Sequence, residues 1–488
     1  MIAPALAAWA VGPLRIPAAV DAAALRHLLD GLGTAIGAAR TGAARPAVTV
    51  ALGLGGPAEA TILGSTDRVS AVAAALANGT LVHALDFDDT HAGGLVHATS
   101  VVLPAALAVG EQVGAPGREV LDATVVGYEV ACRIAAAAPN AFHAGGLHAT
   151  MVAGVFSAAA VAARLMRLDA ATAADALGIA GSQAGGLLAF LAGGASTKQL
   201  HPGFASQAGI QAARLAAAGA SGPANVLDGP HGLYDALAPA AVAAGRVHLD
   251  TILDGLGSRD PDRWETTRIG IKPWPTCQLA HATMAAAQVA LQHAGVGADQ
   301  IVALRATVHP DSAAVVCATD RDLTRPLSAY AAKFSLPWSV AALLVDGAVG
   351  VETYAAEQLD RPEIVALAQR VQWSVLPESR VRGVAADAAG DVVLALADGR
   401  EFVGHADRSP GGGTAPLSDA ALLAKLAGNV GAAAAGGLAA AVRDLPSAPG
   451  LDHLIGCAAA AAAAADLPPH DPDSVPDPDS DPDEERSA

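Results

Sequence analysis

Residues 150–181 read TMVAGVFSAAAVAARLMRLDAATAADALGIAG, and this pattern decides the fold class. Apolar residues, most of them alanine, recur along it at the spacing of one helix face. Residues 21–40, 65–87 and 117–138 repeat the pattern, with short Gly/Pro breaks between the segments. Alanine is the strongest helix former because its side chain loses no entropy on folding. The sequence therefore predicts a mainly α protein.

The pattern changes near Trp264 and changes back after Asp407. Short segments between these points are typical of strands: TTRIGIK (266–272), IVALRATVHP (301–310), RVQWSV (370–375), and VRGVAADAAG (381–390) with DVVLALADGREFVG (391–404) as a hairpin. Helices are predicted between them at 277–295 and 334–349, and a Gly/Pro linker follows. We therefore expect a large all-helical domain, 1–264 and 409–465, interrupted by a smaller α+β lid domain at 265–408.

Composition excludes several classes of function. The net charge is −18 and no basic patch is visible, which argues against a nucleic-acid partner. No apolar run reaches the roughly 20 residues that a membrane span needs. The four cysteines have no paired spacing, and this favours the reducing cytoplasm. Residues 466–488 are acidic and rich in Pro, Asp and Ser, so we expect a disordered, dispensable tail.

The most polar cluster in an apolar setting is HALDFDDTHAGGLVHATS, residues 83–100. If a helix ends near His83, then Asp86, Asp88 and Asp89 fall on its end and the following loop. The residues allow three interpretations, which are an active-site loop, a capped helix end with solvated carboxylates, and a metal site. No fixed ligand pair such as HExxH is present to favour the metal.

Three further clusters carry candidate site residues. His148 precedes a long apolar helix, where it is either structural or part of an anion site. Lys198 opens a helix on which Gly203, Ser206 and Gly209 form a small-residue face for close packing, and it is either a carboxylate ligand or a surface charge. Lys272 ends a predicted strand at the domain junction, a usual place for a pocket.

Cys277 follows Lys272 at the start of a predicted helix. A thiol at a helix N-terminus has a lowered pKa when it is reactive, and it is inert when it is merely buried. The sequence leaves both interpretations open for Cys277.

These clusters together resemble the MmgE/PrpD family, which includes 2-methylcitrate dehydratase, cis-aconitate decarboxylase and iminodisuccinate epimerase. The resemblance covers about residues 1–460 and rests on six blocks in the family's order: ANGTLVHALDFDDTH (77–91), GLHATMVAGVFSAAAVAARLMRLD (146–169), the block from Ala176 to Gly209, GPANVLDG (222–229), KPWPTCQLAH (272–281) and AKFSLPWSVAALLVDG (332–347). It implies a helical domain with an α+β lid, a homodimer, a pocket between the domains, and no metal or organic cofactor.

The resemblance also implies roles for individual residues. The positions that match the family's catalytic and carboxylate-binding residues are Asp86, Thr90, His97, His148, Lys198 and Lys272. His97 and His148 are the candidate bases, His148 first, with Asp86 orienting one of them. Lys198 and Lys272 are expected to bind substrate carboxylates.

Cys277, His281 and Trp338 are further expected substrate contacts, and two of them depart from the family's decarboxylases. Cys277 stands where those enzymes place a catalytic histidine, and Trp338 stands where they have a tyrosine. We therefore expect a lyase or isomerase acting on a small di- or tricarboxylate through an α-carbanion, with dehydration ahead of epimerisation and of decarboxylation. A non-catalytic binding member is the rival, disfavoured by the intact lysines and histidines.

Overall fold

A computed structural model describes residues 1–193 and 195–463, so the predicted acidic tail lies outside the described residues. The first part of the chain is helical, as predicted, and consists of α1 (Ile2–Val11), α2 (Ala18–Thr41), α3 (Arg45–Leu54), α4 (Ala71–His83), α5 (Thr99–Val113), α6 (Gly117–Ala136), α7 (Ala141–Ala144), α8 (Ala149–Leu165), α9 (Ala170–Gly181), α10 (Phe190–Gly193), α11 (Thr197–Ala217), α12 (Leu233–Leu237) and α13 (Pro239–Ala243). Two short antiparallel pairs accompany them, β1 (Ala60–Thr61) with β2 (Arg68–Val69), and β3 (Thr90–His91) with β4 (Ile269–Gly270).

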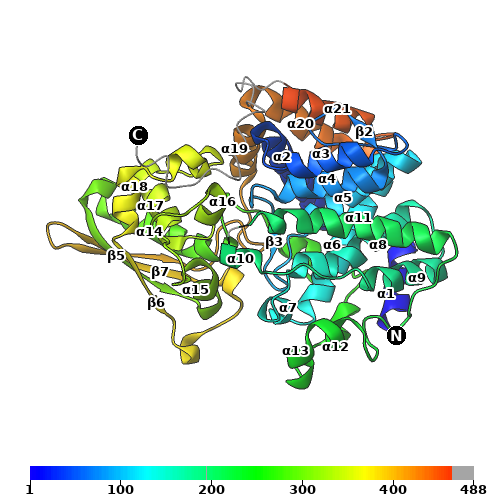
Figure 1. The fold of residues 1–488 in the computed structure, drawn as a ribbon, viewed down its shortest axis with the longest axis horizontal. Helices are drawn as coiled ribbons and strands as arrows, with labels where there is room; N and C mark the ends of the chain where they lie inside the picture. Colours follow the sequence, from blue (N-terminus) through cyan, green and yellow to red (C-terminus); the bar gives the residue numbers. More distant parts are fainter. Residues whose placement is uncertain (194, 464–488) are drawn as a thin grey trace, which may run out of the picture.

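The α+β part follows β4. Its elements are α14 (Gln278–Ala294), β5 (Ile301–Val308), α15 (Pro310–Val316), α16 (Ala329–Ala332), α17 (Leu336–Asp346), α18 (Pro362–Ala368), β6 (Val371–Val375), β7 (Gly390–Leu396) and β8 (Glu401–Ala406). The sheet has the order β6-β5-β7-β8, with β5 and β6 parallel and the other neighbours antiparallel. Helix α14 packs on β7 and β8, and the sheet with its helices stands apart from the larger helical body (Figure 1).

Three helices then return to the helical body: α19 (Asp419–Val430), α20 (Ala432–Asp444) and α21 (Asp452–Ala463). Helix α19 packs against α2 although hundreds of residues separate them in sequence, and Figure 1 shows the orange and red helices beside the blue ones. Buried apolar residues form two clusters, one from residues 3–271 together with 422–461 and the other from 277–396. The mainly α fold with a smaller α+β region is confirmed. No helix in the described ranges is both long and apolar enough to cross a bilayer.

Two of the predicted strands are wrong. Residues 265–268 form a short 3-10 helix, so only Ile269 and Gly270 of the first segment are extended. The hairpin lies within residues 390–406, because the chain reverses at Gly399, whose φ of +87° is accessible to glycine. Residues 381–389 contain a 3-10 turn and no strand.

Helix α11 lies at the centre of the helical body, and its small residues allow this position. A Cβ on Gly203 would lie 2.3 Å from the backbone oxygen of Leu76 on α4, and a Cβ on Gly209 would lie 2.5 Å from the Ala158 Cβ on α8. The small-residue face predicted from sequence is therefore a close helix crossing on two sides. This crossing fixes the position of Lys198, at the start of α11.

Gly203→Ala is accordingly expected to lower the free energy of unfolding by about 1–3 kcal/mol, because the added methyl meets backbone that cannot rotate away. Gly436→Ala on α20 is the matched control, because no atom of the described residues lies within 4 Å of the added Cβ. Its free energy of unfolding should rise by about 0.5–1 kcal/mol, since alanine has a higher helix propensity than glycine. Urea unfolding of both variants measures the difference. Equal midpoints would show that the crossing tolerates a side chain.

Candidate active site

The aspartate loop is buried rather than solvated. Helix α4 ends at His83, and Asp86 turns the chain with a φ of +51°. Asp86, Asp88 and Asp89 are each 1% exposed or less. Because buried carboxylates need partners, the interpretation as a solvated helix end is wrong.

Asp86 is partnered by the two predicted lysines. Lys198 donates to Asp86 Oδ1 at 2.7 Å, and Lys272 donates to the same oxygen at 3.1 Å and to the Asp86 carbonyl at 3.0 Å. Burial alone would raise the Asp86 pKa, but the two ammonium charges hold that pKa well below its usual range. The expectation that Asp86 orients a histidine needs correction, since its carboxylate pairs with lysines 112 and 186 positions away.

Asp88 is the carboxylate that contacts histidine. Its Oδ2 lies 2.8 Å from His83 Nδ1 and 3.9 Å from His97 Nδ1. Burial opposes ionisation of Asp88, but His83 and His97 keep its pKa below the ordinary value. An ionised carboxylate can only accept a hydrogen bond, so His83 carries its proton on Nδ1. His83 Nε2 is buried and has no hydrogen-bond partner among the described residues.

His97 presents one free nitrogen to the site. Its Nδ1 lies 2.8 Å from the Asp89 carbonyl and 3.2 Å from the hydroxyl of Thr90. A carbonyl only accepts, so Nδ1 carries the proton and Nε2 keeps its lone pair. Among the described residues, nothing hydrogen-bonds to that Nε2. Burial and nearby Lys272 lower the His97 pKa well below its usual value despite the opposing influence of Asp88, so the free imidazole is neutral.

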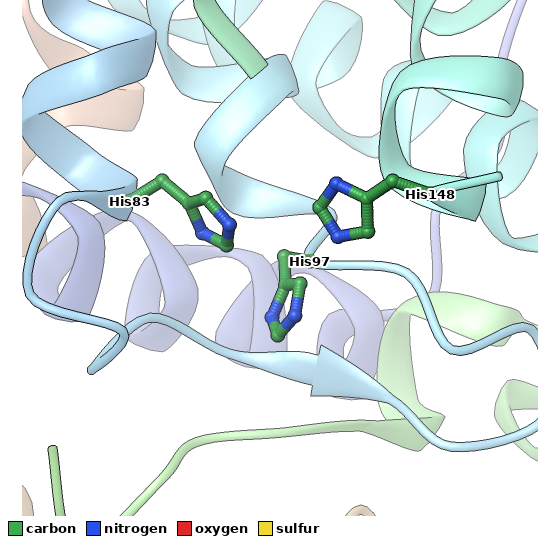
Figure 2. Close-up of side chains that lie close together, drawn as sticks. All are labelled: His83, His97 and His148. Atoms are coloured by element: carbon green, nitrogen blue, oxygen red, sulfur yellow. The ribbon is translucent and has the colours of Figure 1, made fainter. Parts of the chain in front are cut away.

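His148 has both ring nitrogens occupied. Its Nε2 lies 3.1 Å from the Thr150 hydroxyl, and its Nδ1 lies 3.1 Å from Nδ1 of His201. Burial, followed by the charge of Lys198, lowers the His148 pKa well below the ordinary value. The rings of His83, His97 and His148 face a common point (Figure 2), with centroids 4.7–5.7 Å apart.

A cavity of about 320 Å³ connects these groups. It is lined by seven residues predicted from sequence: Asp86, Thr90, His97, His148, Lys198, Lys272 and Cys277. Its remaining wall is largely apolar, with Leu95, Leu188, Phe190, Leu191, Leu279, Val315 and Phe334 as the larger side chains. Lys198 Nζ lies 5.0 Å from the centre of the Phe334 ring. A partly apolar pocket with a few convergent charged groups is typical of a small-molecule site.

Two predicted substrate contacts do not line this cavity. His281 is fully buried, with Nε2 3.2 Å from the Thr276 carbonyl, and burial lowers its pKa to about 3. Trp338 is fully buried in the second apolar cluster, where its indole N–H donates to the Leu359 carbonyl. Both predictions are wrong, because helix periodicity turns these residues into the core of the α+β part.

Cys277 does line the cavity, as predicted. It precedes the first turn of α14, but burial and then the charge of Asp86 raise the pKa of its thiol. This favours the interpretation of Cys277 as an inert side chain in the cavity wall.

Three residues near the site, buried His201 and Lys333 and half-buried His143, were not singled out from sequence. His201 hydrogen-bonds His148, and its position three residues after Lys198 on one helix was the available signal. His143 lines the cavity beside the His148 ring. Lys333 donates to the carbonyls of Leu85 and Pro275, joining the aspartate loop to the α+β part, and burial lowers its pKa to about 7.

The chain is similar over most of its described length to one family of proteins. The MmgE/PrpD N-terminal domain matches residues 5–244, and the MmgE/PrpD C-terminal domain matches residues 274–442. The cis-aconitate decarboxylase of Aspergillus terreus is 28% identical over 436 residues, covering 85% of this chain and 86% of that protein. The cis-aconitate decarboxylases of Mus musculus and Homo sapiens are 27% and 28% identical over 387 residues, covering 76% of this chain and 74% and 75% of theirs. With both family domains matched in order across most of its length, the chain belongs to the MmgE/PrpD family.

Proposed function

We propose that this protein is a cofactor-independent lyase that dehydrates a small di- or tricarboxylate bearing a hydroxyl group, in the manner of a 2-methylcitrate dehydratase. The observation that carries the proposal is the unpartnered Nε2 of His97, in a cavity that also presents two lysines. A neutral imidazole with a free lone pair is a competent base near neutral pH. Two ammonium groups suit the carboxylate that must hold the developing charge.

The steps assign one task to each group. His97 Nε2 removes the proton on the carbon next to a carboxylate, and the electron pair moves into that carboxylate as an aci-carboxylate. Lys198 and Lys272 stabilise this dianionic group. The hydroxyl on the neighbouring carbon then leaves as water with a proton from the imidazolium form of His148, whose charge the bound substrate carboxylates stabilise. Solvent afterwards takes the proton from His97 and returns one to His148. The C–O bond breaks as the C=C bond forms, so the products are the alkene and one water.

His148 suits the role of acid because its neighbours connect it to a proton supply. The Thr150 hydroxyl and the His201 ring are both within hydrogen-bond distance of it. This arrangement supports an order of roles opposite to the one expected from sequence, with His97 as the base and His148 as the acid.

Decarboxylation is the second candidate because the three relatives described above are named cis-aconitate decarboxylases. It uses the same stabilised carbanion, formed by loss of CO₂ in place of a proton. Epimerisation uses the carbanion formed by proton removal and then returns the proton to the opposite face. By resemblance, Cys277 stands where the family's decarboxylases place a catalytic histidine, and the lack of that imidazole favours dehydration over decarboxylation.

The experiment is a panel of hydroxylated and unsaturated di- and tricarboxylates incubated with the pure protein in D₂O and followed by NMR. Dehydration yields an alkene, epimerisation yields deuterated substrate of inverted configuration, and decarboxylation yields a shorter acid with CO₂. Binding without any of these changes, seen as line broadening alone, would show a non-catalytic member of the family and contradict the proposal.

Lys198→Ala is expected to raise KM roughly tenfold or more, because one charge-assisted hydrogen bond to a carboxylate contributes about 1.5–3 kcal/mol. Lys272 still neutralises Asp86 in this variant, which protects the fold. Arg305→Ala is the control, since that cation pairs with Glu401 on the sheet of the α+β part and does not line the cavity. Steady-state kinetics of both variants make the comparison. An unchanged KM in Lys198→Ala would remove this lysine from carboxylate binding.

A further inference from the structure

We propose that His83, His97 and His148 form a binding site for a first-row transition metal ion such as Zn²⁺, and that the bound ion blocks turnover. One nitrogen from each of the three buried rings lies within 4.8 Å of the other two (Figure 2). Neutral imidazole is a preferred ligand of Zn²⁺, Cu²⁺ and Ni²⁺. Three histidines with an open fourth position are a known zinc arrangement in proteins.

The hydrogen bonds around His83 and His97 leave one nitrogen of each ring available for an ion, whereas His148 must release either the Thr150 hydroxyl or the His201 ring to bind one. His83 donates from Nδ1 to Asp88, and His97 donates from Nδ1 to the Asp89 carbonyl. Each thereby keeps its Nε2 lone pair, and His83 Nε2 is buried with no other partner. A histidine that binds a metal ion through one ring nitrogen usually donates a hydrogen bond from the other nitrogen to a carboxylate or carbonyl.

Unpaired carboxylate oxygens lie in the same place. Ligand atoms of His83, Asp86 and Asp88 also lie within 4.8 Å of one another. Asp86 Oδ2 and Asp88 Oδ1 are both buried without a hydrogen-bond partner. The charges of these two carboxylates balance those of Lys198 and Lys272, so the immediate surroundings do not repel a cation. Two carboxylates that each have an unpaired oxygen among the described residues therefore belong to the same buried cluster as His83.

Binding requires a modest movement of the rings. Zn–N bonds of about 2.0–2.1 Å in a tetrahedral site place the nitrogens about 3.3 Å apart. His97 and His148 border the cavity, and their rings approach the ion by giving up present hydrogen bonds, while His83 is held by Asp88. The cavity supplies the fourth position for a water molecule.

The expected consequence is inhibition, and this part rests on the proposed function. An ion bound to His97 Nε2 removes the lone pair that acts as the base. An ion on His148 removes the proposed acid as well. Treatment of the protein with EDTA should therefore leave turnover intact, whereas added Zn²⁺ should abolish it reversibly.

The test uses the full chain, stripped with EDTA, desalted and titrated with Co²⁺, whose tetrahedral complexes absorb visible light. We expect one equivalent of Co²⁺ to give a d–d band that Zn²⁺ removes. Asp88→Asn should weaken Zn²⁺ binding by about 10–100-fold, since it removes the group that orients His83. His83→Ala should eliminate the band, with circular dichroism confirming the fold; should that variant unfold, His97→Gln at the cavity wall makes the same test.

Surface groups that bind metal provide the control. Cys457 Sγ lies 3.9 Å from His453 Nε2, and His405 lies between Asp391 and Asp407. A protein carrying Cys457→Ser and His405→Gln should keep the band and the inhibition. Three results would contradict the proposed metal site. They are loss of the band in this protein, persistence of the band in a folded His83→Ala variant, and the absence of any tetrahedral Co²⁺ signal. A signal without inhibition would keep the site and instead contradict the role given to His97.

Discussion

His97→Ala is expected to lower kcat by about 10²–10⁴-fold, because it removes the base from the reacting C–H bond. KM for the substrate should change little, since the lysines that bind the carboxylate remain in place. The same variant should stop the entry of solvent deuterium at the α-carbon of the substrate. Steady-state kinetics together with NMR in D₂O measure both effects.

His148→Ala separates the two histidines. If His148 is the acid, its loss should slow product formation while α-deuterium exchange continues. His281→Ala is the control for the loss of a buried ring, because His281 does not line the cavity and its variant should retain exchange in the folded protein. Full exchange in His97→Ala combined with none in His148→Ala would reverse the assignment.

Asp86→Ala is expected to destabilise the fold by about 3–5 kcal/mol, the usual loss when one partner of a buried ion pair is removed. Lys198 and Lys272 would then carry two positive charges in a buried site, and Lys272 is fully buried. Chemical unfolding with urea measures the effect.

A surface ion pair supplies the comparison for Asp86→Ala. Glu401→Ala removes the partner of Arg305, where both side chains are about half exposed, and should change stability by less than about 1 kcal/mol. Adding Lys272→Met to Asp86→Ala should recover part of the loss, because it removes one unpaired charge. If Asp86→Ala lowered the free energy of unfolding by less than about 1 kcal/mol, Lys198 and Lys272 would have to be neutral or solvated in the absence of the Asp86 carboxylate.

The sequence by itself determined the helical class and pointed to residues that the structure brings to one cavity. Alanine at helical spacing specifies helices whatever surrounds them, and the α+β part was recognisable because its segments alternate in the strand period and lack the alanine pattern. Seven of the nine predicted site residues line one cavity, because the motifs that carry them are local blocks of sequence. The small-residue face of α11 also predicted its close packing correctly.

Only the tertiary structure decided which groups are partners. Asp86 contacts Lys198 and Lys272, which are distant in sequence. No local sequence pattern predicts that its carboxylate pairs with these lysines and not with the histidines that are nearer in sequence. The same holds for His97 and His148: both are buried histidines in sequence motifs, and only their hydrogen bonds show which one has a free nitrogen.

Tertiary structure also decided which predicted residues turn away from the site. His281 and Trp338 lie in motifs beside cavity residues, but both side chains are fully buried within the α+β part and neither lines the cavity. A helix turns by about 100° per residue, so a motif places neighbours on different faces. Packing then decides which face borders the cavity. Residue types and local spacing fix what chemistry is available, whereas the direction of each side chain depends on contacts between segments that are distant in sequence.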